Sequence, residues 1–167
     1  FDQWGVVSTG GVLQPDSWTL AGASGVFTRS TTTRRGRYSL SAQRVGTTLT
    51  IEVVVPVLYS AASQDSLRSR TVTGVAVVRS AQASSCRVRV TSEDGSGVVL
   101  STTNSGYHAG GGTWSELSAE HTVHASAEQV RLSGRVEVDE TSLWDELALS
   151  EGVLGDSLRR DVATTEW

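Results

Sequence analysis

The sequence predicts an all-β domain, an antiparallel β-sandwich of the jelly-roll type. Short segments of alternating apolar and polar residues recur about every 8 to 15 residues, with Gly, Ser and Asp between them. Apolar residues at helical spacing occur only in "GDSLRRDVATTEW", and there for about two turns. The length of 167 residues suits one domain. We expect the sandwich to span residues 1–151, with 1–14 as a candidate N-terminal arm and 152–167 as a C-terminal tail.

The first two strong strand signals lie in the first half of the chain. In "TTLTIEVVVPV", residues 47–57, Leu49, Ile51, Val53 and Val55 fall on one face, and Pro56 removes a donor from the ladder. We therefore expect a strand that ends at an edge or a bend. Residues 70–81, "RTVTGVAVVRSA", are richer in Val and alternate less clearly, which indicates a strand covered on both faces.

Four further strands are predicted in the second half. Residues 86–102, "CRVRVTSEDGSGVVLST", have the pattern of a hairpin, because Asp94, Gly95 and Gly97 suit a turn. Residues 130–140 alternate with a period of two, which is typical of a half-buried strand. In the closing strand, 142–152, one parity carries Leu143, Asp145, Leu147 and Leu149, and the other carries Trp144, Glu146 and Ala148.

Charge and hydropathy narrow the classes of partner. The formal net charge is −4, and all fourteen basic residues are arginine. A negative total argues against nucleic acid as the main partner, which needs a clustered basic face. No apolar run approaches the roughly 18 residues that suggest a membrane span. The short basic run "RRGR", with Arg34 and Arg35, is interpreted as a solvated turn or a protein contact.

The sequence offers no pattern typical of an enzyme. It contains no G-x-S-x-G motif, and "GGGTW" is followed by a strand and has no lysine, unlike a phosphate loop. His121 and His124 in "HTVH" would point to opposite faces of a strand, so they form a poor metal chelate. The lone Cys86 alternates with Val88 and Val90 and is predicted to be a core residue. We therefore expect no catalytic activity.

Aromatic residues supply the candidate contacts. Trp18, Trp114 and Trp144 adjoin apolar patterns and are predicted at the core or its edge. Trp4 and Trp167, with Phe1, lie near the chain ends and suggest contacts between subunits. The stretch "GYHAGGGTW", residues 106–114, is interpreted as a loop around one end of the sandwich, with Tyr107 and His108 at its tip.

Several motifs in order resemble those of one known family. They are "PDSWTLAG" (15–22), "RRGRYSLSAQR" (34–44), "LRSRTVTGVAVVRSA" (67–81), "YHAGGGTWSELSAEHTV" (107–123) and "TSLWDELALSEG" (141–152). Their order and spacing resemble galactose-binding-like jelly-roll domains of the carbohydrate-binding-module type, which recur in bacterial glycosidases and in tailed-phage virion proteins. The chain departs from that pattern at Val77, where carbohydrate-binding members often carry an aromatic residue.

The sequence around "YHAGGGTW" is most similar to that of the phage-virion-associated branch of the family. This resemblance implies a non-catalytic structural module of a tailed-phage virion, a capsid decoration or tail-associated protein. Its partners would be other virion proteins and further copies of itself as a homo-oligomer. Subunit contacts would involve the chain ends and the basic run, namely Phe1, Trp4, Trp167, Arg34 and Arg35.

The alternative is a secreted or extracellular carbohydrate-binding module, free or part of a larger glycoside hydrolase. A virion module could also bind host glycans. Glycan contacts would then come from Tyr38, Tyr59, Tyr107, His108 and Trp114, since exposed aromatic rings beside polar groups suit sugars. No cofactor is expected except a structural calcium ion, which the family often holds near the ends of the sandwich. Asp145 could ligate it, or could instead cap a turn or pair with an arginine.

Overall fold

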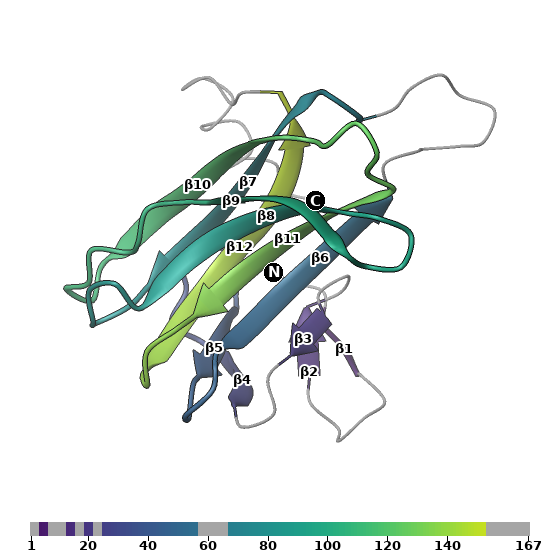
Figure 1. Cartoon of the computed structure of the whole chain (residues 1–167). Coiled ribbons are helices and arrows are strands. Elements are labelled where there is room, and N and C mark those ends of the chain that lie inside the picture. Colours follow the sequence, from purple (N-terminus) through teal and green to yellow (C-terminus); the bar gives the residue numbers. More distant parts are fainter. Residues whose placement is uncertain (1–3, 7–12, 16–18, 22–24, 57–66, 153–167) are drawn as a thin grey trace.

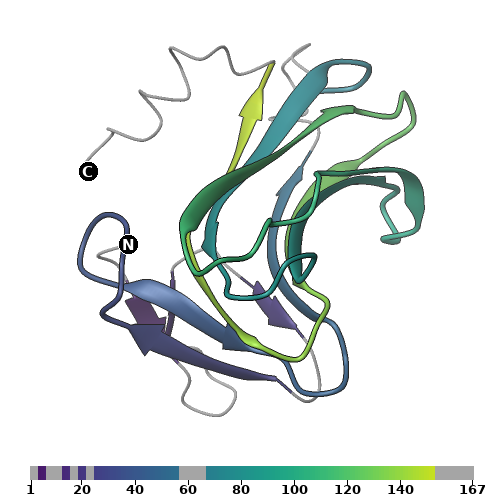
Figure 2. The same ribbon diagram turned by 90° about the vertical axis from the view of Figure 1, so that its left-hand side faces the viewer.

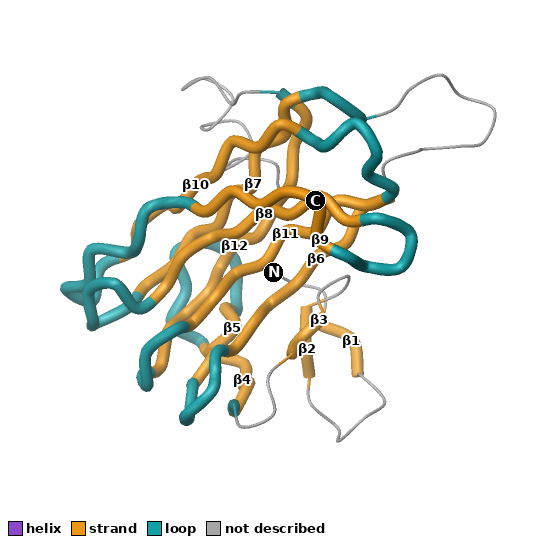
Figure 3. Tube along the Cα trace, viewed as in Figure 1, coloured by secondary structure: helices purple, strands orange, loops and turns teal. Residues whose placement is uncertain are grey.

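The computed structural model describes residues 4–6, 13–15, 19–21, 25–56 and 67–152 (Figure 1). Every regular element in these residues is a β-strand, and Figure 3 shows the tube of the described residues without a helix. Within that part of the chain, no helix has the length and apolar character needed to cross a membrane. The predicted all-β class is therefore confirmed.

The strands form two five-stranded antiparallel sheets. The front sheet has the order β3-β6-β11-β8-β9, and the back sheet has the order β10-β7-β12-β5-β4. Figures 1 and 2 show the two sheets stacked as layers, the arrangement expected of a jelly-roll sandwich. The strands are β1 (Trp4–Val6), β2 (Leu13–Pro15), β3 (Thr19–Ala21), β4 (Val26–Ser30), β5 (Ser39–Gln43), β6 (Leu49–Pro56), β7 (Thr71–Arg79), β8 (Cys86–Glu93), β9 (Val99–Asn104), β10 (Trp114–Thr122), β11 (Gln129–Val136) and β12 (Thr141–Glu151).

The core fills the space between the two sheets. Its largest fully buried side chain is Trp144 of β12, which reaches across to Gly134 of β11 in the opposite sheet. Cys86 is 0% exposed and belongs to the same cluster, as predicted. Burial raises the pKa of its thiol to about 11, so Cys86 is a core residue and not a nucleophile. Other members include Leu40, Leu49, Ile51, Val88, Val90, Leu132 and Val136.

Strand β7 lies between β10 and β12 and is buried along residues 72–78. This confirms the prediction of a strand covered on both faces. Strand β6 ends at Pro56, also as predicted, and pairs with β3 over residues 50–52 on its outer side.

The hairpin of β8 and β9 is confirmed, and its turn is organised by Asp94. The Asp94 carboxylate accepts hydrogen bonds from the N–H groups of Ser96 and Val98, each 2.9 Å long. Gly97 follows with φ of +82°, a conformation that side chains strongly disfavour. The side chain of an aspartate thus fixes the turn before a left-handed glycine, which is the role that turn propensities favour.

Strand β11 has the expected alternation but a shorter length. Val130, Leu132 and Val136 are buried between the sheets, while Arg131 and Arg135 point to the other side. The strand ends at Val136, so the predicted continuation to residue 140 is wrong. Residues 138–140 form a bend instead, and Val138 is half-buried there.

The predicted parity of β12 is also wrong beyond Trp144. The register with β7 shifts between Trp144 and Glu146, which is a β-bulge. A bulge inserts one extra residue, so the side chains after it change face. Trp144 and Leu147 consequently both lie in the core, although their spacing is odd.

The first strands form a small sheet of their own, because β1 pairs with β2 in antiparallel register. They lie in and beside the candidate arm, residues 1–14. The side chain of Trp4 is not described. Phe1, Trp18, Tyr59, Trp167 and the tail beyond Gly152 lie outside the described residues, so the predictions made for them remain predictions.

Candidate functional site

The outer side of the front sheet carries an unusual concentration of arginine. Residues of β8 and β11 alternate between the core and this outer side, and each strand contributes two arginines to it. Arg87 lies directly opposite Arg135, and Arg89 opposite Ser133. We call this surface the arginine face and define it by Arg87, Arg89, Thr91, Glu93, Thr102, Asn104, Tyr107, Arg131, Ser133, Arg135 and Glu137.

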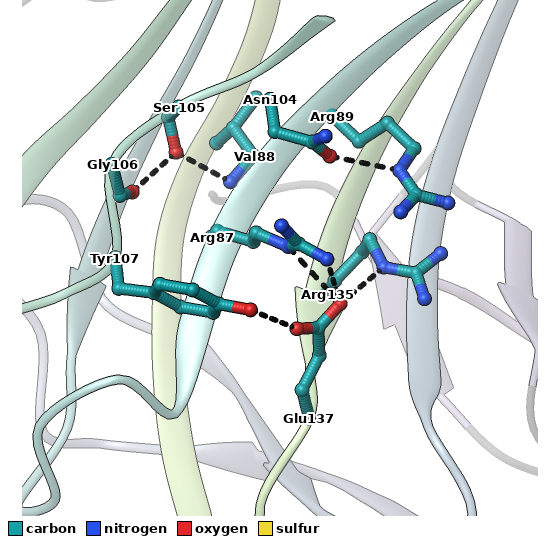
Figure 4. Close-up of polar contacts among 9 residues, drawn as sticks. All are labelled: Arg87, Val88, Arg89, Asn104, Ser105, Gly106, Tyr107, Arg135 and Glu137. Carbon is teal, nitrogen blue, oxygen red and sulfur yellow. Dashed lines mark hydrogen bonds and ion pairs between the residues drawn. The ribbon is translucent and has the colours of Figure 1, made fainter. Parts of the chain in front are cut away.

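The shape of the sheet suits a binding surface. Figure 2 shows the long strands of the front sheet bent, with their hollow side turned away from the back sheet. Figure 4 shows the labelled side chains of the arginine face together on one side of β8 and β11. The back sheet lies behind them, on the other side of the core. On the arginine face, Tyr107, Thr102 and Asn104 are exposed, whereas Thr91, Glu93 and Ser133 are buried.

Glu137 is the centre of the best-ordered cluster (Figure 4). Its Oε1 atom accepts hydrogen bonds from Arg135 Nε at 2.8 Å and from Arg87 Nη2 at 2.9 Å. Its Oε2 atom accepts a hydrogen bond of 2.7 Å from the Tyr107 hydroxyl. Partial burial alone would raise the pKa of Glu137, but these hydrogen bonds lower it to about 2. The carboxylate is therefore ionised over the whole physiological range.

Tyr107 is held in place although it is exposed. Its side chain is 45% exposed, and the Arg87 guanidinium lies 4.8 Å from the ring centroid. The hydrogen bond to Glu137 raises the pKa of the Tyr107 hydroxyl. Two contacts thus fix an accessible aromatic ring, so a ligand that packs against it would not have to order the side chain first.

A second cluster, around Glu93, lies further along the same face. Glu93 is 3% exposed, and its two oxygens accept hydrogen bonds from Arg131 Nε (2.8 Å) and Arg131 Nη2 (3.0 Å). Gln129 donates a further bond of 2.7 Å. Burial would raise the pKa of Glu93, but the bonds from Arg131 and Gln129 lower it overall. The Arg131 guanidinium therefore binds both oxygens of the Glu93 carboxylate, and this ion pair stabilises the sheet.

The loop 106–113 does not present His108 to solvent, so the prediction that this residue lies at the tip is wrong. His108 is 1% exposed, and its Nδ1 atom accepts the N–H of Gly110 at 2.9 Å. Its backbone also pairs with Cys86 and Ser84. A buried ring cannot touch a glycan at the surface. Tyr107, the preceding residue, remains accessible.

The three glycines of this loop are needed for its backbone. Their φ angles are +83°, +80° and +69° for Gly110, Gly111 and Gly112. At Gly110 an added Cβ would also lie 2.5 Å from the backbone nitrogen of Ala83. The loop therefore turns the chain at one end of the sandwich, as the sequence predicts.

The remaining predicted contact residues lie away from the arginine face. Tyr38 is half-buried at the start of β5 in the back sheet, with the Arg29 guanidinium 4.1 Å from its ring centroid. Trp114 is half-buried at the start of β10, in register with Arg79. This position agrees with the prediction of a core-edge residue. The structure does not bring Tyr38, Trp114 and Tyr107 together.

Asp145 caps a turn, which is one of the roles that the sequence left open. Its Oδ2 atom accepts hydrogen bonds from the backbone N–H groups of Arg34 (2.6 Å) and Arg35 (2.8 Å). These donors suit an anion and oppose a cation, so this oxygen does not fit a calcium site. Among the described residues, no group of three or more His, Cys, Asp or Glu side chains could hold a metal ion. The side chains of Arg34 and Arg35 are exposed.

The prediction that the two histidines of "HTVH" lie on opposite faces of one strand is wrong, because β10 ends at Thr122, before His124. His121 is 2% exposed between the sheets, with Ser92 Oγ at 2.8 Å from Nε2 and Thr103 Oγ1 at 2.8 Å from Nδ1. Burial lowers the pKa of His121. His124 is exposed, and its Nδ1 atom accepts a hydrogen bond from the N–H of Ser126. Each imidazole has a structural role, and neither lies beside an activated nucleophile among the described contacts.

The architecture defines a fold class, the antiparallel jelly-roll β-sandwich. No protein-family model matches the sequence, and no curated protein matches it. Solved structures do resemble the fold. One is a xylan-binding domain from Paenibacillus barcinonensis, a family 22 carbohydrate-binding module (TM-score 0.58, 11% identity, 90% of this chain and 92% of that chain).

Two larger proteins contain a similar domain. The tailspike protein 4 of bacteriophage CBA120 has a TM-score of 0.64 at 10% identity over 82% of this chain. A two-module fragment of a Clostridium thermocellum xylanase, solved with xylohexaose, has a TM-score of 0.63 at 12% identity over 83% of this chain. The chain spans only 20% and 26% of these two structures. At such identities the similarity shows the fold alone.

Sequence reasoning did not identify the arginines and Glu137 as a site. A signal was present in the alternation of each predicted strand. Arg87 and Arg89 fall on one face of the first strand, and Arg131, Arg135 and Glu137 fall on one face of the other. What was missing was the pairing of β8 with β11, since β8 ends at Glu93 and β11 begins only at Gln129, yet the two strands lie side by side. The sequence pointed to Tyr107 as a contact residue, but not to Glu137 and Arg87, which hold its ring.

Proposed function

We propose that the chain is a non-catalytic carbohydrate-binding module that binds a polysaccharide on the arginine face. The observation that carries this proposal is Tyr107, an exposed aromatic ring fixed by Glu137 and Arg87 on the hollow side of a sheet. Sugars present apolar C–H faces with hydroxyl groups around the edge. An immobile aromatic ring beside hydrogen-bonding side chains is suited to both features.

The polar part of such a site comes from the strands next to Tyr107. Asn104 and Thr102 are exposed on β9, and Arg89 lies beside them on β8. Their amide, hydroxyl and guanidinium groups supply donors and acceptors at the spacing of neighbouring strands, about 5 Å. This spacing is comparable to one sugar unit, so successive units can contact successive strands.

The fold supports the same proposal. Two of the similar structures bear xylan-related names, one a xylan-binding domain and the other a xylanase fragment solved with xylohexaose. Since the chain covers about a quarter of that fragment, we propose that the module is carried by a larger protein. Such a protein would act outside the cell that produces it, where polysaccharides are found.

A virion is the second candidate location for this module. The observation in its favour is the similarity to a domain of a bacteriophage tailspike. A virion module that binds surface glycans of a host would use the same face. Its partners would then be capsid or tail proteins and other copies of the chain, through Phe1, Trp4, Trp167, Arg34 and Arg35.

A glycan array with the purified chain tests the proposal. We expect binding to a polysaccharide, and we expect Tyr107→Ala to weaken it by about tenfold or more because a stacking platform is lost. Tyr38→Ala is the matched control, because Tyr38 immediately precedes β5 of the back sheet. Tyr107→Phe keeps the ring and removes only the bond to Glu137, so it should retain most of the affinity.

Two results would contradict the proposal. One is a folded chain that binds no glycan on a broad array. The other is binding that survives Tyr107→Ala and is lost in Tyr38→Ala, which would move the site to the back sheet.

A further inference from the structure

The arginine face carries more positive than negative charge. Four guanidinium groups share it with two carboxylates among the side chains that the structure describes, although the whole chain has a formal net charge of −4. A third acidic residue, Glu52, is placed by register opposite Ser133, on the far side of β11 from Arg89. The excess of positive charge is therefore local and lies on β8 and β11.

The described carboxylates are already engaged. Glu93 pairs with Arg131, and Glu137 pairs with Arg87 and Arg135 through its Oε1 atom. Arg135 uses only its Nε atom in that pair. Its two terminal nitrogens have no hydrogen-bond partner among the described residues.

Arg89 forms no hydrogen bond or ion pair with a carboxylate within the described part of the chain. Its one hydrogen bond runs from Nε to Asn104 Oδ1 at 2.9 Å, and this bond orients the guanidinium without neutralising it. Burial lowers the pKa of Arg89, and so do the charges of Arg135 and Arg87, which outweigh the opposing charge of Glu137. The side chain is thus held among like charges, which an anion would relieve.

The two forks lie next to each other. Arg135 is opposite Arg87, and Arg89 is two residues further along β8, which makes Arg89 and Arg135 diagonal neighbours on one face. Figure 4 shows their terminal nitrogens on the same side, away from Glu137. A planar guanidinium binds a carboxylate or a sulfate group through two parallel hydrogen bonds.

Tyr107 lies close enough for one ligand to use both features. The Tyr107 hydroxyl and Arg135 Nε bind the two oxygens of a single carboxylate, that of Glu137. The aromatic ring and the two free forks therefore border the same part of the sheet. A sugar unit on the ring can place a substituent of its own, or of the next unit, at the forks.

We infer that the ligand of the arginine face is an acidic polysaccharide, whose carboxylate or sulfate group binds between Arg89 and Arg135. This inference rests on the proposed function and specifies its ligand class. A neutral glycan would offer no negative charge to the terminal nitrogens of the two forks, whereas an anionic glycan pairs with them. Such a site discriminates by charge as well as by ring shape.

Matched polysaccharides test the inference by affinity electrophoresis and calorimetry. Polygalacturonate is compared with its methyl ester, and heparin with desulfated heparin, so that each pair differs mainly in charge. We expect the charged member of one pair to bind at least about tenfold more tightly. The preferred pair distinguishes a carboxylate ligand from a sulfate ligand. The affinity should fall as the salt concentration rises.

Variants connect the preference to the forks. Arg89→Gln should reduce the preference for the charged member by about tenfold while leaving the circular dichroism spectrum unchanged. Arg89→Lys keeps the charge without the fork and should be intermediate. Arg37→Gln is the matched control, since it makes the same change of charge at an exposed arginine outside the arginine face.

The outcomes separate the two proposals. Binding of neutral polysaccharides with no preference for charge would overturn this inference and leave the proposed function intact. Charge preference that persists in Arg89→Gln, or that is lost equally in Arg37→Gln, would also overturn it. Failure to bind any polysaccharide, neutral or acidic, would overturn the proposed function itself.

Discussion

Replacing Gly134 with alanine should destabilise the sandwich, because the inner side of β11 has no room for a methyl group at this position. A Cβ atom on Gly134 would lie 2.6 Å from Cζ3 and 3.0 Å from Cη2 of Trp144. The indole ring is completely buried, and its Nε1 atom donates a hydrogen bond of 2.8 Å to Ser142 Oγ. The ring is therefore held on both sides and cannot easily move away.

The geometry sets the size of the effect. Carbon atoms in contact are normally about 3.5–4.0 Å apart, so an overlap of about 1 Å must be relieved by separating β11 from β12. An added methyl group in a packed core costs about 1–3 kcal/mol, and alanine recovers about 0.5–1 kcal/mol by restricting the unfolded chain. We expect a net loss of about 1–2 kcal/mol, or about 2–8 °C in Tm for a chain of this size.

Thermal and urea denaturation measure this loss. Gly106→Ala is the matched control, since no atom lies within 4 Å of a Cβ built there, and it should change the stability by less than about 0.5 kcal/mol. The double variant Gly134→Ala with Trp144→Leu should lose less stability than the sum of the losses of the two single variants. The reason is that removing the indole ring also removes the clash with the alanine methyl group at position 134. Equal stabilities of Gly134→Ala and Gly106→Ala would refute the reasoning.

Two further predictions concern carboxylates. Asp145→Ala should cost about 2–3 kcal/mol, because the backbone N–H groups of Arg34 and Arg35 lose their acceptor, and Asp145→Asn should cost less. Urea denaturation checks this order, and an unchanged midpoint for Asp145→Ala would contradict it. Acidification should weaken the fold through Glu137, whose pKa falls from 4.5 to about 2 on folding. The unfolded chain binds the extra proton between these values, so the stabilisation is complete above pH 4.5 and is lost as the pH falls toward 2. Glu137→Gln should flatten the pH dependence of Tm in this window, and parallel curves would exclude this role.

The sequence was sufficient to predict burial in strands whose pattern of apolar residues is unbroken from one end to the other. In β11 the residues Val130, Leu132 and Val136 meet the core because side chains alternate strictly in a regular strand. In β7 residues 72–78 are all buried, and a Val-rich run with little alternation is what such a strand requires. Local composition and period determine these elements, so they could be predicted.

Where the period is broken, the prediction failed for a physical reason. The bulge between Trp144 and Glu146 adds one residue to β12, and no residue type marks that insertion. Asp145 is buried at the bulge because two backbone N–H groups from a distant turn reach it. The burial of His108 likewise depends on the segment 80–86, against which its loop packs. Such contacts connect residues far apart in the chain.

The arginine face illustrates the same limit for the site. The outward direction of Arg87 and Arg89 follows from alternation, but their meeting with Arg135 and Glu137 follows from strand order. A single sequence shows which residues share a face of each strand, but it does not show which other strand pairs with it. Tyr107 could be selected as an exposed aromatic residue, whereas the contacts that immobilise it could not.

The burial of Cys86 has a practical consequence for studying this protein. It is the one cysteine in the sequence, it is 0% exposed, and its thiol has a pKa of about 11. A thiol reagent can reach it only when the two sheets separate, so the labelling rate reports the free energy of that opening, as hydrogen exchange does for amides. The unmodified chain thus contains its own kinetic probe of sandwich opening, positioned between the layers.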